Sequence, residues 1–117
     1  MATKRAKFFH KPNCTTCRKA RTLLESSGVT LELRDLGKDR LTAPELETLI
    51  GDRDHLKFLN SRNELYRKHK MGKNPPSRSN AIRMMAKEPN LIRRPVTISG
   101  RKMVVGYDES ALNSICE

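Results

Sequence analysis

The sequence predicts an α/β fold, and three observations lead to this prediction. An apolar run at 6–10 and an alternating run at 29–35 have the patterns of strands, and a segment of helical periodicity lies between them. A strand, a helix and a second strand within about 30 residues form a βαβ unit with a right-handed crossover and parallel strands. Two cysteines, three positions apart, stand where the first strand passes into the helix.

The remaining elements follow from periodicity and capping signals. The first helix is predicted over 15–27 and stops at Gly28. Thr42 and Glu45 form a capping box, which predicts a short helix that continues to Ile50.

A further helix is predicted over 54–69, where apolar side chains recur on one face and Arg62 falls in the middle of this stripe. The next helix is capped by Ser77 and ends near Glu88. These helices form an insertion at about 42–88.

Two strands and a helix complete the chain. A strand over 91–98 is followed by a hairpin loop and an antiparallel strand at 103–105, and Asp108 caps the last helix. The order strand-helix-strand, helical insertion, strand-strand-helix is that of a thioredoxin-like fold of the glutaredoxin type, with the insertion between the second and third strands. No repeat or long linker divides the sequence, so we predict a single domain over 1–117.

Composition limits the classes of protein that fit. Hydrophobic residues make up 36% and charged residues 32% of the 117 positions, and no apolar run has the length of a membrane span. No apolar segment of a signal peptide follows the basic N-terminus. Three cysteines do not make the disulfide framework of a small secreted protein. We therefore expect a cytoplasmic protein.

The formal charge of +11 is unevenly distributed. Residues 53–102 contain 14 Lys and Arg but three Asp and Glu, whereas the two flanking regions cancel each other. Such a segment attracts anions, which include small oxyanions, nucleic acid and acidic protein surfaces, or it is simply a solvated face. Because the sequence has two Tyr, three Phe and no Trp for base stacking, specific nucleic-acid binding is not expected. Non-specific nucleic-acid binding by residues 53–102 is a weaker alternative, which predicts a steep loss of binding as salt rises.

Cys14 and Cys17 form a CxxC motif at the predicted start of the first helix. Unpaired N–H groups and the positive end of the helix dipole favour a thiolate there, and the neighbouring Arg18 and Lys19 act in the same direction. We interpret Cys14 as the nucleophile and Cys17 as the resolving thiol. Asn13, in the turn before Cys14, is assigned to the substrate site.

Two alternatives to redox chemistry stay open at this point. A CxxC can be half of a zinc site, but the other candidates, Cys116 and three histidines, contain no second close pair, so no metal site is assigned. The two cysteines can also be structural and inert. Cys116 itself is interpreted as a structural or incidental thiol.

Two arginines are candidate anion ligands. Thioredoxin-like folds commonly carry a cis-proline before the third strand, so we predict a cis Arg94-Pro95 bond, with Pro95 in the substrate site and Arg94 near Cys14. Arg62 either reaches solvent from the edge of its helix or clamps an oxyanion beside Cys14. A guanidinium suits oxyanions because its planar fork donates paired hydrogen bonds.

Three stretches carry a resemblance to a known family: Cys14-Thr15-Thr16-Cys17-Arg18-Lys19-Ala20, Ser61-Arg62 and Leu91-Ile92-Arg93-Arg94-Pro95-Val96. With them, the sequence resembles the ArsC/Spx family over nearly the whole chain. That family contains glutaredoxin-type arsenate reductases and the Spx-type regulators that bind RNA polymerase. The resemblance implies that Cys14 is the nucleophile and that Arg62 and Arg94 bind an anion. Two departures are similar to the Spx branch: a third arginine of the reductases is replaced by Gly106-Tyr107, and a second cysteine is present.

We therefore expect a thiol oxidoreductase of arsenate-reductase type, in which Cys14 attacks an oxyanion and Cys17 or glutathione resolves the adduct. No cofactor is expected beyond glutathione, thioredoxin or glutaredoxin as the reductant. The alternative is a redox-switch regulator that binds the C-terminal domain of the RNA polymerase α subunit. In the Spx-type relatives the contact segment corresponds to 51–54, where this sequence does not align cleanly.

Overall fold

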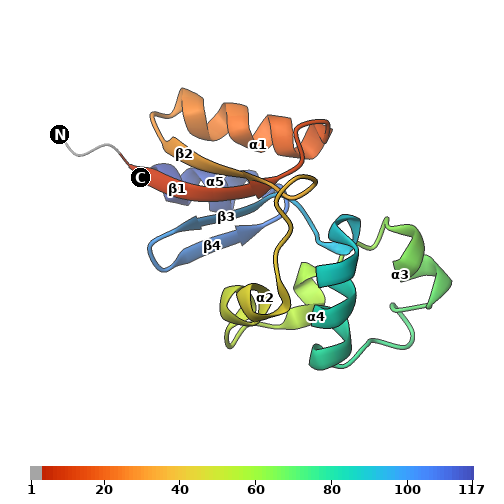
Figure 1. Ribbon diagram of the computed structural model, residues 1–117. Coiled ribbons are helices and arrows are strands. Elements are labelled where there is room, and N and C mark those ends of the chain that lie inside the picture. The colour runs from red at the N-terminus through yellow and green to blue at the C-terminus, as the bar shows by residue number, and fades with distance from the viewer. Residues whose placement is uncertain (1–3) are drawn as a thin grey trace. The chain divides into compact units, whose positions relative to one another are not determined.

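Figure 1 shows the fold in a computed structural model that describes residues 4–117. The chain divides into two compact units. The sheet unit contains the chain up to Asp39 and from Arg94 onward, and the helical unit spans Arg40–Arg93. The elements of the sheet unit are β1 (Arg5–His10), α1 (Thr15–Ser26), β2 (Thr30–Asp35), β3 (Val96–Ser99), β4 (Lys102–Val105) and α5 (Glu109–Cys116).

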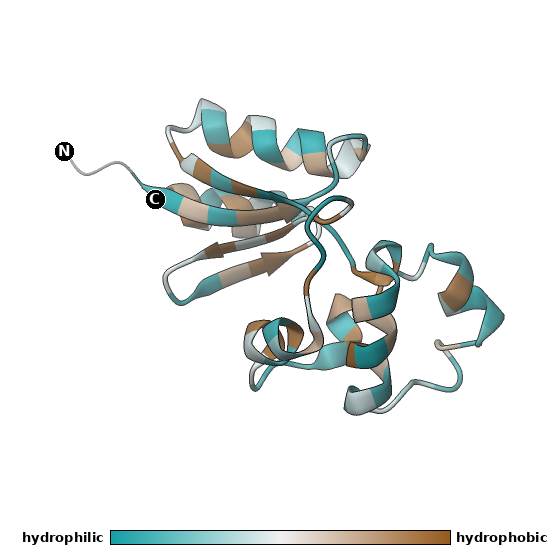
Figure 2. Cartoon of the chain, viewed as in Figure 1, coloured by the Kyte–Doolittle hydropathy of each residue, from teal (hydrophilic) through white to brown (hydrophobic). Residues whose placement is uncertain are grey.

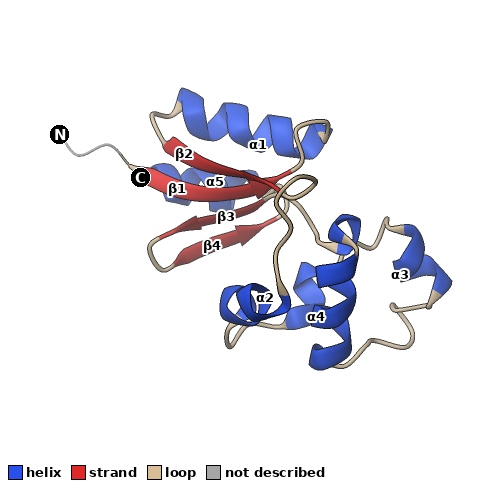
Figure 3. Ribbon diagram, in the orientation of Figure 1, coloured by secondary structure: helices blue, strands red, loops and turns tan. Residues whose placement is uncertain are grey.

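The strands form one mixed sheet in the order β2-β1-β3-β4 (Figure 3). β1 and β2 are parallel, with Phe8 beside Leu33 and His10 beside Asp35, and α1 makes the crossover between them. β3 is antiparallel to both β1 and β4. The predicted α/β fold with a helical insertion between the second and third strands is therefore confirmed.

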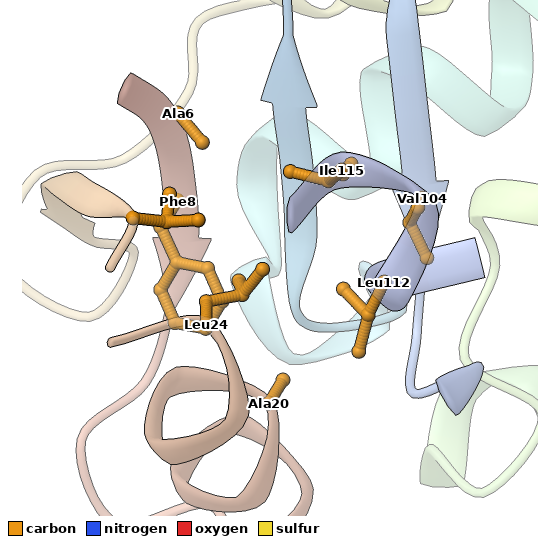
Figure 4. Packing of buried hydrophobic residues seen from close by; sticks show 8 residues of the cluster. Ala6, Phe8, Ala20, Leu24, Val104, Leu112 and Ile115 are labelled. Atoms are coloured by element: carbon orange, nitrogen blue, oxygen red, sulfur yellow. The ribbon is translucent and has the colours of Figure 1, made fainter. Parts of the chain in front are cut away.

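The core of the sheet unit lies between the sheet and the helices α1 and α5 (Figure 4). Successive strand residues point to opposite faces, so Phe8 enters this core whereas Lys7 is exposed. Phe8 and Leu24 are fully buried, and burial of one such side chain stabilises the fold by about 1.5–3 kcal/mol. The buried members of the cluster are Ala6, Phe8, Ala20, Leu24, Val29, Val104, Leu112 and Ile115.

The helical unit is made of short helices with polar caps. Its elements are α2 (Ala43–Ile50), the 3-10 helix η1 (His55–Phe58), α3 (Glu64–Lys68), α4 (Arg78–Lys87) and the 3-10 helix η2 (Pro89–Leu91). The predicted capping box is present: the Thr42 hydroxyl accepts from the Glu45 N–H at 3.3 Å, and the Glu45 carboxylate accepts from the Thr42 N–H at 3.1 Å. Hydrophobic and hydrophilic residues share each helix, as expected for amphipathic helices (Figure 2).

The prediction of one helix over 54–69 is wrong. The chain forms η1 and α3 instead, with a turn between them. The Asn60 side chain accepts the Arg62 N–H at 3.0 Å, and the Asn63 side chain caps α3 through the Leu65 N–H at 2.9 Å. Asparagine side chains compete for backbone N–H groups in this way, which ends one helix and starts the next.

The third strand begins at Val96, later than the predicted 91–98. The residues before it make their hydrogen bonds within the helical unit: the Arg93 N–H donates to the Phe58 carbonyl oxygen at 2.7 Å, and Ile92 pairs with Leu59. These backbone groups are thus already paired and do not extend β3.

Among the helices of residues 4–117, none combines the length and the apolar character that crossing a membrane requires.

Candidate active site

A tight turn brings Cys14 to the start of α1. The Cys14 N–H donates to the Lys11 carbonyl oxygen at 3.1 Å, which closes a turn around Pro12 and Asn13. Proline suits this position because its ring fixes φ near about −65°. The Cys14 carbonyl oxygen then accepts the Arg18 N–H at 3.0 Å, so Cys14 is the N-cap residue of α1. Its sulfur therefore lies where the helix presents unpaired N–H groups.

The surroundings of Cys14 favour its thiolate. Partial burial raises the pKa of the thiol, but the Cys17 backbone N–H, the Cys17 side chain and the Arg94 guanidinium together outweigh burial, so the pKa lies below the ordinary value. The helix dipole acts in the same direction. Because the thiolate is the reactive form of cysteine, Cys14 is the better nucleophile of the pair.

Cys17 has the opposite character. It lies one turn into α1 and is 1% exposed. Burial raises the pKa of Cys17 to about 12, and the adjacent Cys14 adds to this, while the Lys11 backbone N–H and Arg94 act against it. Cys17 is therefore a protonated thiol whose S–H faces the Cys14 sulfur. When Cys14 loses its negative charge, one cause of the raised pKa disappears and Cys17 becomes easier to deprotonate.

Arg94 belongs to the same unit as the cysteines and lies beside Cys14, whose pKa it lowers. The Arg94-Pro95 peptide bond is cis, as predicted. Arg93 is exposed and Arg94 half-buried, so the two neighbouring side chains differ in their access to solvent. Pro95 is itself buried, and its carbonyl oxygen accepts the Gly106 N–H at 2.7 Å, which ties this segment to the end of β4.

The other two assigned residues differ in position. Asn13 is exposed at the tip of the turn that precedes Cys14. The prediction that Arg62 lies on the apolar stripe of a helix is wrong. Arg62 is exposed in the turn before α3, in the helical unit. Its carbonyl oxygen accepts from the Arg67 guanidinium at 3.1 Å. Its approach to Cys14 stays a prediction.

Two further residues lie between β1 and the CxxC or at the end of β1, and the sequence analysis did not assign either of them to the site. The Lys11 backbone N–H faces the Cys17 sulfur and opposes its raised pKa. His10, at the end of β1, is 4% exposed. Burial lowers the pKa of His10 and Arg21 lowers it further, against the effect of Asp35, so the neutral imidazole is favoured. His10 ends the strand that leads to the CxxC, and this position in the sequence could have pointed to it as a residue near the site.

The three cysteines are free thiols. Within residues 4–117, no three His, Cys, Asp or Glu side chains gather in a group that could hold a metal ion. Cys116 is part of α5, where its thiol donates to the Leu112 carbonyl oxygen at 3.4 Å. The thiol pair at the start of α1, with Arg94 beside it, is therefore the candidate active site.

Fold and site together define a thioredoxin-like protein with two thiols at the start of its first helix. More particularly, the chain belongs to the ArsC family, whose model matches residues 9–115.

Individual relatives extend this comparison. A 15.7 kDa protein of the draG 3′ region of Rhodospirillum rubrum is 29% identical over 92% of this chain and 75% of its own. The global transcriptional regulator Spx of Streptococcus mutans is 27% identical over 92% of this chain and 80% of its own. The structure of an arsenate reductase from Vibrio cholerae aligns with a TM-score of 0.84, covering 97% of this chain and 99% of that one. At 22% identity, this last likeness shows the shared fold.

Proposed function

We propose that this protein is a thiol-dependent oxidoreductase of arsenate-reductase type. The observation that carries the proposal is the contrast between the two thiols: Cys14 has a lowered pKa beside Arg94, and Cys17 has a raised pKa directly behind it. A nucleophile and a protonated second thiol in contact are the requirements for two consecutive substitutions that end in a disulfide. Membership of the ArsC family supports an oxyanion as the substrate.

In the first step the anion docks at the N-terminus of α1, where free N–H groups and the Arg94 guanidinium offset its charge. The Cys14 thiolate attacks As(V), a sulfur–arsenic bond forms, and an arsenic–oxygen bond breaks, so that a hydroxyl group of the arsenate takes up a proton from solvent and leaves as water. The charge on Cys14 is consumed in this step. Arg62 is a second candidate ligand of the anion.

In the second step a thiolate, from Cys17 or from glutathione, attacks the Cys14 sulfur. A sulfur–sulfur bond forms, and the sulfur–arsenic bond breaks with its electron pair on arsenic, which leaves as As(III). The two electrons come from the two thiols. Reduction of the resulting disulfide by thioredoxin or glutaredoxin completes the cycle.

The test is an arsenate-reduction assay coupled to NADPH, supplied separately with glutathione and glutaredoxin or with thioredoxin. Cys14→Ser is expected to abolish turnover, and Cys17→Ser to make turnover dependent on glutathione. Cys116→Ser is the matched control and is expected to keep full activity. NADPH consumption that does not depend on arsenate would reject the arsenate substrate.

A second function is supported by the Spx relatives and by the contact between the two thiols. Oxidation of Cys14 and Cys17 to a disulfide removes the thiolate that faces Arg94, and such a change can control the binding of a partner. On this proposal the partner is the C-terminal domain of the RNA polymerase α subunit. A pull-down with that domain, run with reduced and with oxidised protein, decides the matter, since binding in neither state rejects the regulator.

A further inference from the structure

The helical unit contains a dense cluster of exposed cations that the thiol site does not use. The segment 67–73, here called the basic turn, has the sequence Arg-Lys-His-Lys-Met-Gly-Lys and comprises the last two residues of α3 and the turn after it. Its cationic side chains are exposed, and Met71 is buried at 4% exposure. In the described part of the chain, Lys68, Lys70 and Lys73 make no ion pair. Figure 1 shows α3 and its flanking loops standing apart from α2 and α4.

Hydrogen bonds hold the backbone of the basic turn in a defined conformation. The Met71 N–H donates to the Tyr66 carbonyl oxygen at 3.0 Å, and the Lys70 N–H donates to the Arg67 carbonyl oxygen at 3.1 Å. These two bonds form the Schellman motif that ends many helices, and the buried Met71 supplies its apolar contact. The lysines are thus presented from an ordered turn.

The residue at the key position of this motif is unexpected. Lys70 has a φ of 49°, in the left-handed region where glycine is normally found. Any residue with a side chain is less favourable there than glycine, so stability by itself does not explain a lysine. Strained conformations of this kind concentrate at functional positions. A lysine at this position therefore points to a use of its charge apart from folding.

The chemistry of the surface favours one class of partner. Protein interfaces have an apolar centre and are depleted in lysine, whereas the basic turn exposes no large apolar side chain and is rich in lysine. Contacts to nucleic-acid phosphates need cations and no apolar centre. The segment contains no Phe, Tyr or Trp, and its exposed His69 is the only ring in it, so it is poorly suited to stacking on successive single-stranded bases.

We propose that the basic turn binds the phosphate backbone of double-stranded nucleic acid without sequence preference. This proposal is independent of the proposed thiol chemistry. It goes beyond the general attraction expected from a charge of +11, because it assigns the contacts to three lysines on one ordered turn.

The test measures binding of the protein to a short, labelled DNA duplex of mixed sequence by fluorescence anisotropy at several salt concentrations. The variant Lys68→Gln/Lys70→Gln/Lys73→Gln removes the proposed contacts. The control Lys7→Gln/Lys38→Gln/Arg101→Gln removes the same charge from exposed positions of the sheet unit. Circular dichroism and thermal melts verify that both variants are folded.

The wild type is expected to lose affinity steeply as salt rises from about 50 to 200 mM. Each lost phosphate contact reduces the magnitude of the negative slope of log K against log salt by about 0.9, so the basic-turn variant should reduce that magnitude by about 2 to 3. The control should change the slope much less. Equal losses in both variants, or no binding at the lowest salt, would overturn the proposal. Competition by poly-glutamate as strong as by unlabelled duplex at equal charge would also overturn it, in favour of an acidic protein surface.

A second variant separates binding from folding. Lys70→Gly relieves the left-handed backbone and removes one cation. The melting temperature is expected to rise while the affinity for the duplex falls. Unchanged affinity in Lys70→Gly would contradict a role for this lysine in binding.

Discussion

At the scale of single residues, the two cysteines are chemically different although they are three positions apart. Cys14 caps the helix, where the Cys17 N–H and Arg94 lower its pKa, whereas burial raises the pKa of Cys17 to about 12. The order of reaction follows from this difference. Cys14 reacts first, and Cys17 follows once the charge on Cys14 is gone.

The pH dependence of alkylation tests the state of Cys14. In a Cys17→Ser/Cys116→Ser background, the rate with iodoacetamide should rise with pH to a plateau whose midpoint lies below the ordinary thiol value of about 8.5. Arg94→Gln removes a positive charge and should move the midpoint upward. Arg93→Gln, which alters an exposed neighbour, is the control and should leave it in place. A midpoint at the ordinary value in the parent protein would contradict an activated Cys14.

Stability at high pH tests the state of Cys17. Because its folded-state pKa is raised to about 12, the folded chain keeps this proton after the unfolded chain has lost it, so stability falls as pH rises from about 8.5 towards 12. Urea unfolding of the reduced protein should show this decrease, and Cys17→Ala should make it shallower. Cys116→Ala is the matched control. An unchanged slope in Cys17→Ala would show that Cys17 does not titrate as assigned.

At the scale of elements, α1 serves both the core and the site. Its buried face holds Cys17, Ala20 and Leu24, so the packing that fixes the helix on the sheet also buries the second thiol. The Pro12-Asn13 turn at its start sets where Cys14 lies. Packing of α1 is therefore a condition for the thiol chemistry.

Truncation of one core residue tests this packing. Leu24→Ala leaves a cavity at a fully buried position and should lower the free energy of unfolding by about 2–5 kcal/mol. Leu33→Ala, at a leucine that is 41% exposed, is the control and should change the free energy of unfolding by much less. Chemical denaturation of both variants measures the difference, and similar losses would contradict the assigned core.

At the scale of the whole molecule, the candidate active site and the basic turn belong to different units. The thiol pair and Arg94 belong to the sheet unit, and the basic turn belongs to the helical unit. The helical unit includes α3, which has no buried residue, whereas β1 is mostly buried. The two units are therefore expected to differ in local stability.

Native-state hydrogen exchange tests this expectation. Amides of β1 and β3 should exchange slowest, because their hydrogen bonds lie inside the sheet. Amides of α3 and of the basic turn should exchange faster. Mass spectrometry of peptides from both regions gives the comparison, and equal protection would show that the chain opens as one cooperative unit.

The sequence by itself determined the local features of this protein. The alternation of strand residues, the capping box of α2 and the CxxC after a strand all depend on residues a few positions apart, so the α/β order and the position of Cys14 could be predicted. The predicted helix over 54–69 failed because periodicity does not register the hydrogen bonds of Asn60 and Asn63.

The sequence assigned the roles of the two thiols, but the tertiary structure decided how burial and Arg94 shift their pKa values. The pKa values of Cys14 and Cys17 depend on burial and on Arg94, which lies far away in the sequence and close by in the folded sheet unit. The left-handed conformation of Lys70 is likewise known only from the structure, in which Lys70 lies between the end of α3 and the buried Met71. Charge and burial act through space, so only the folded chain fixes which thiol is acidic and which is not.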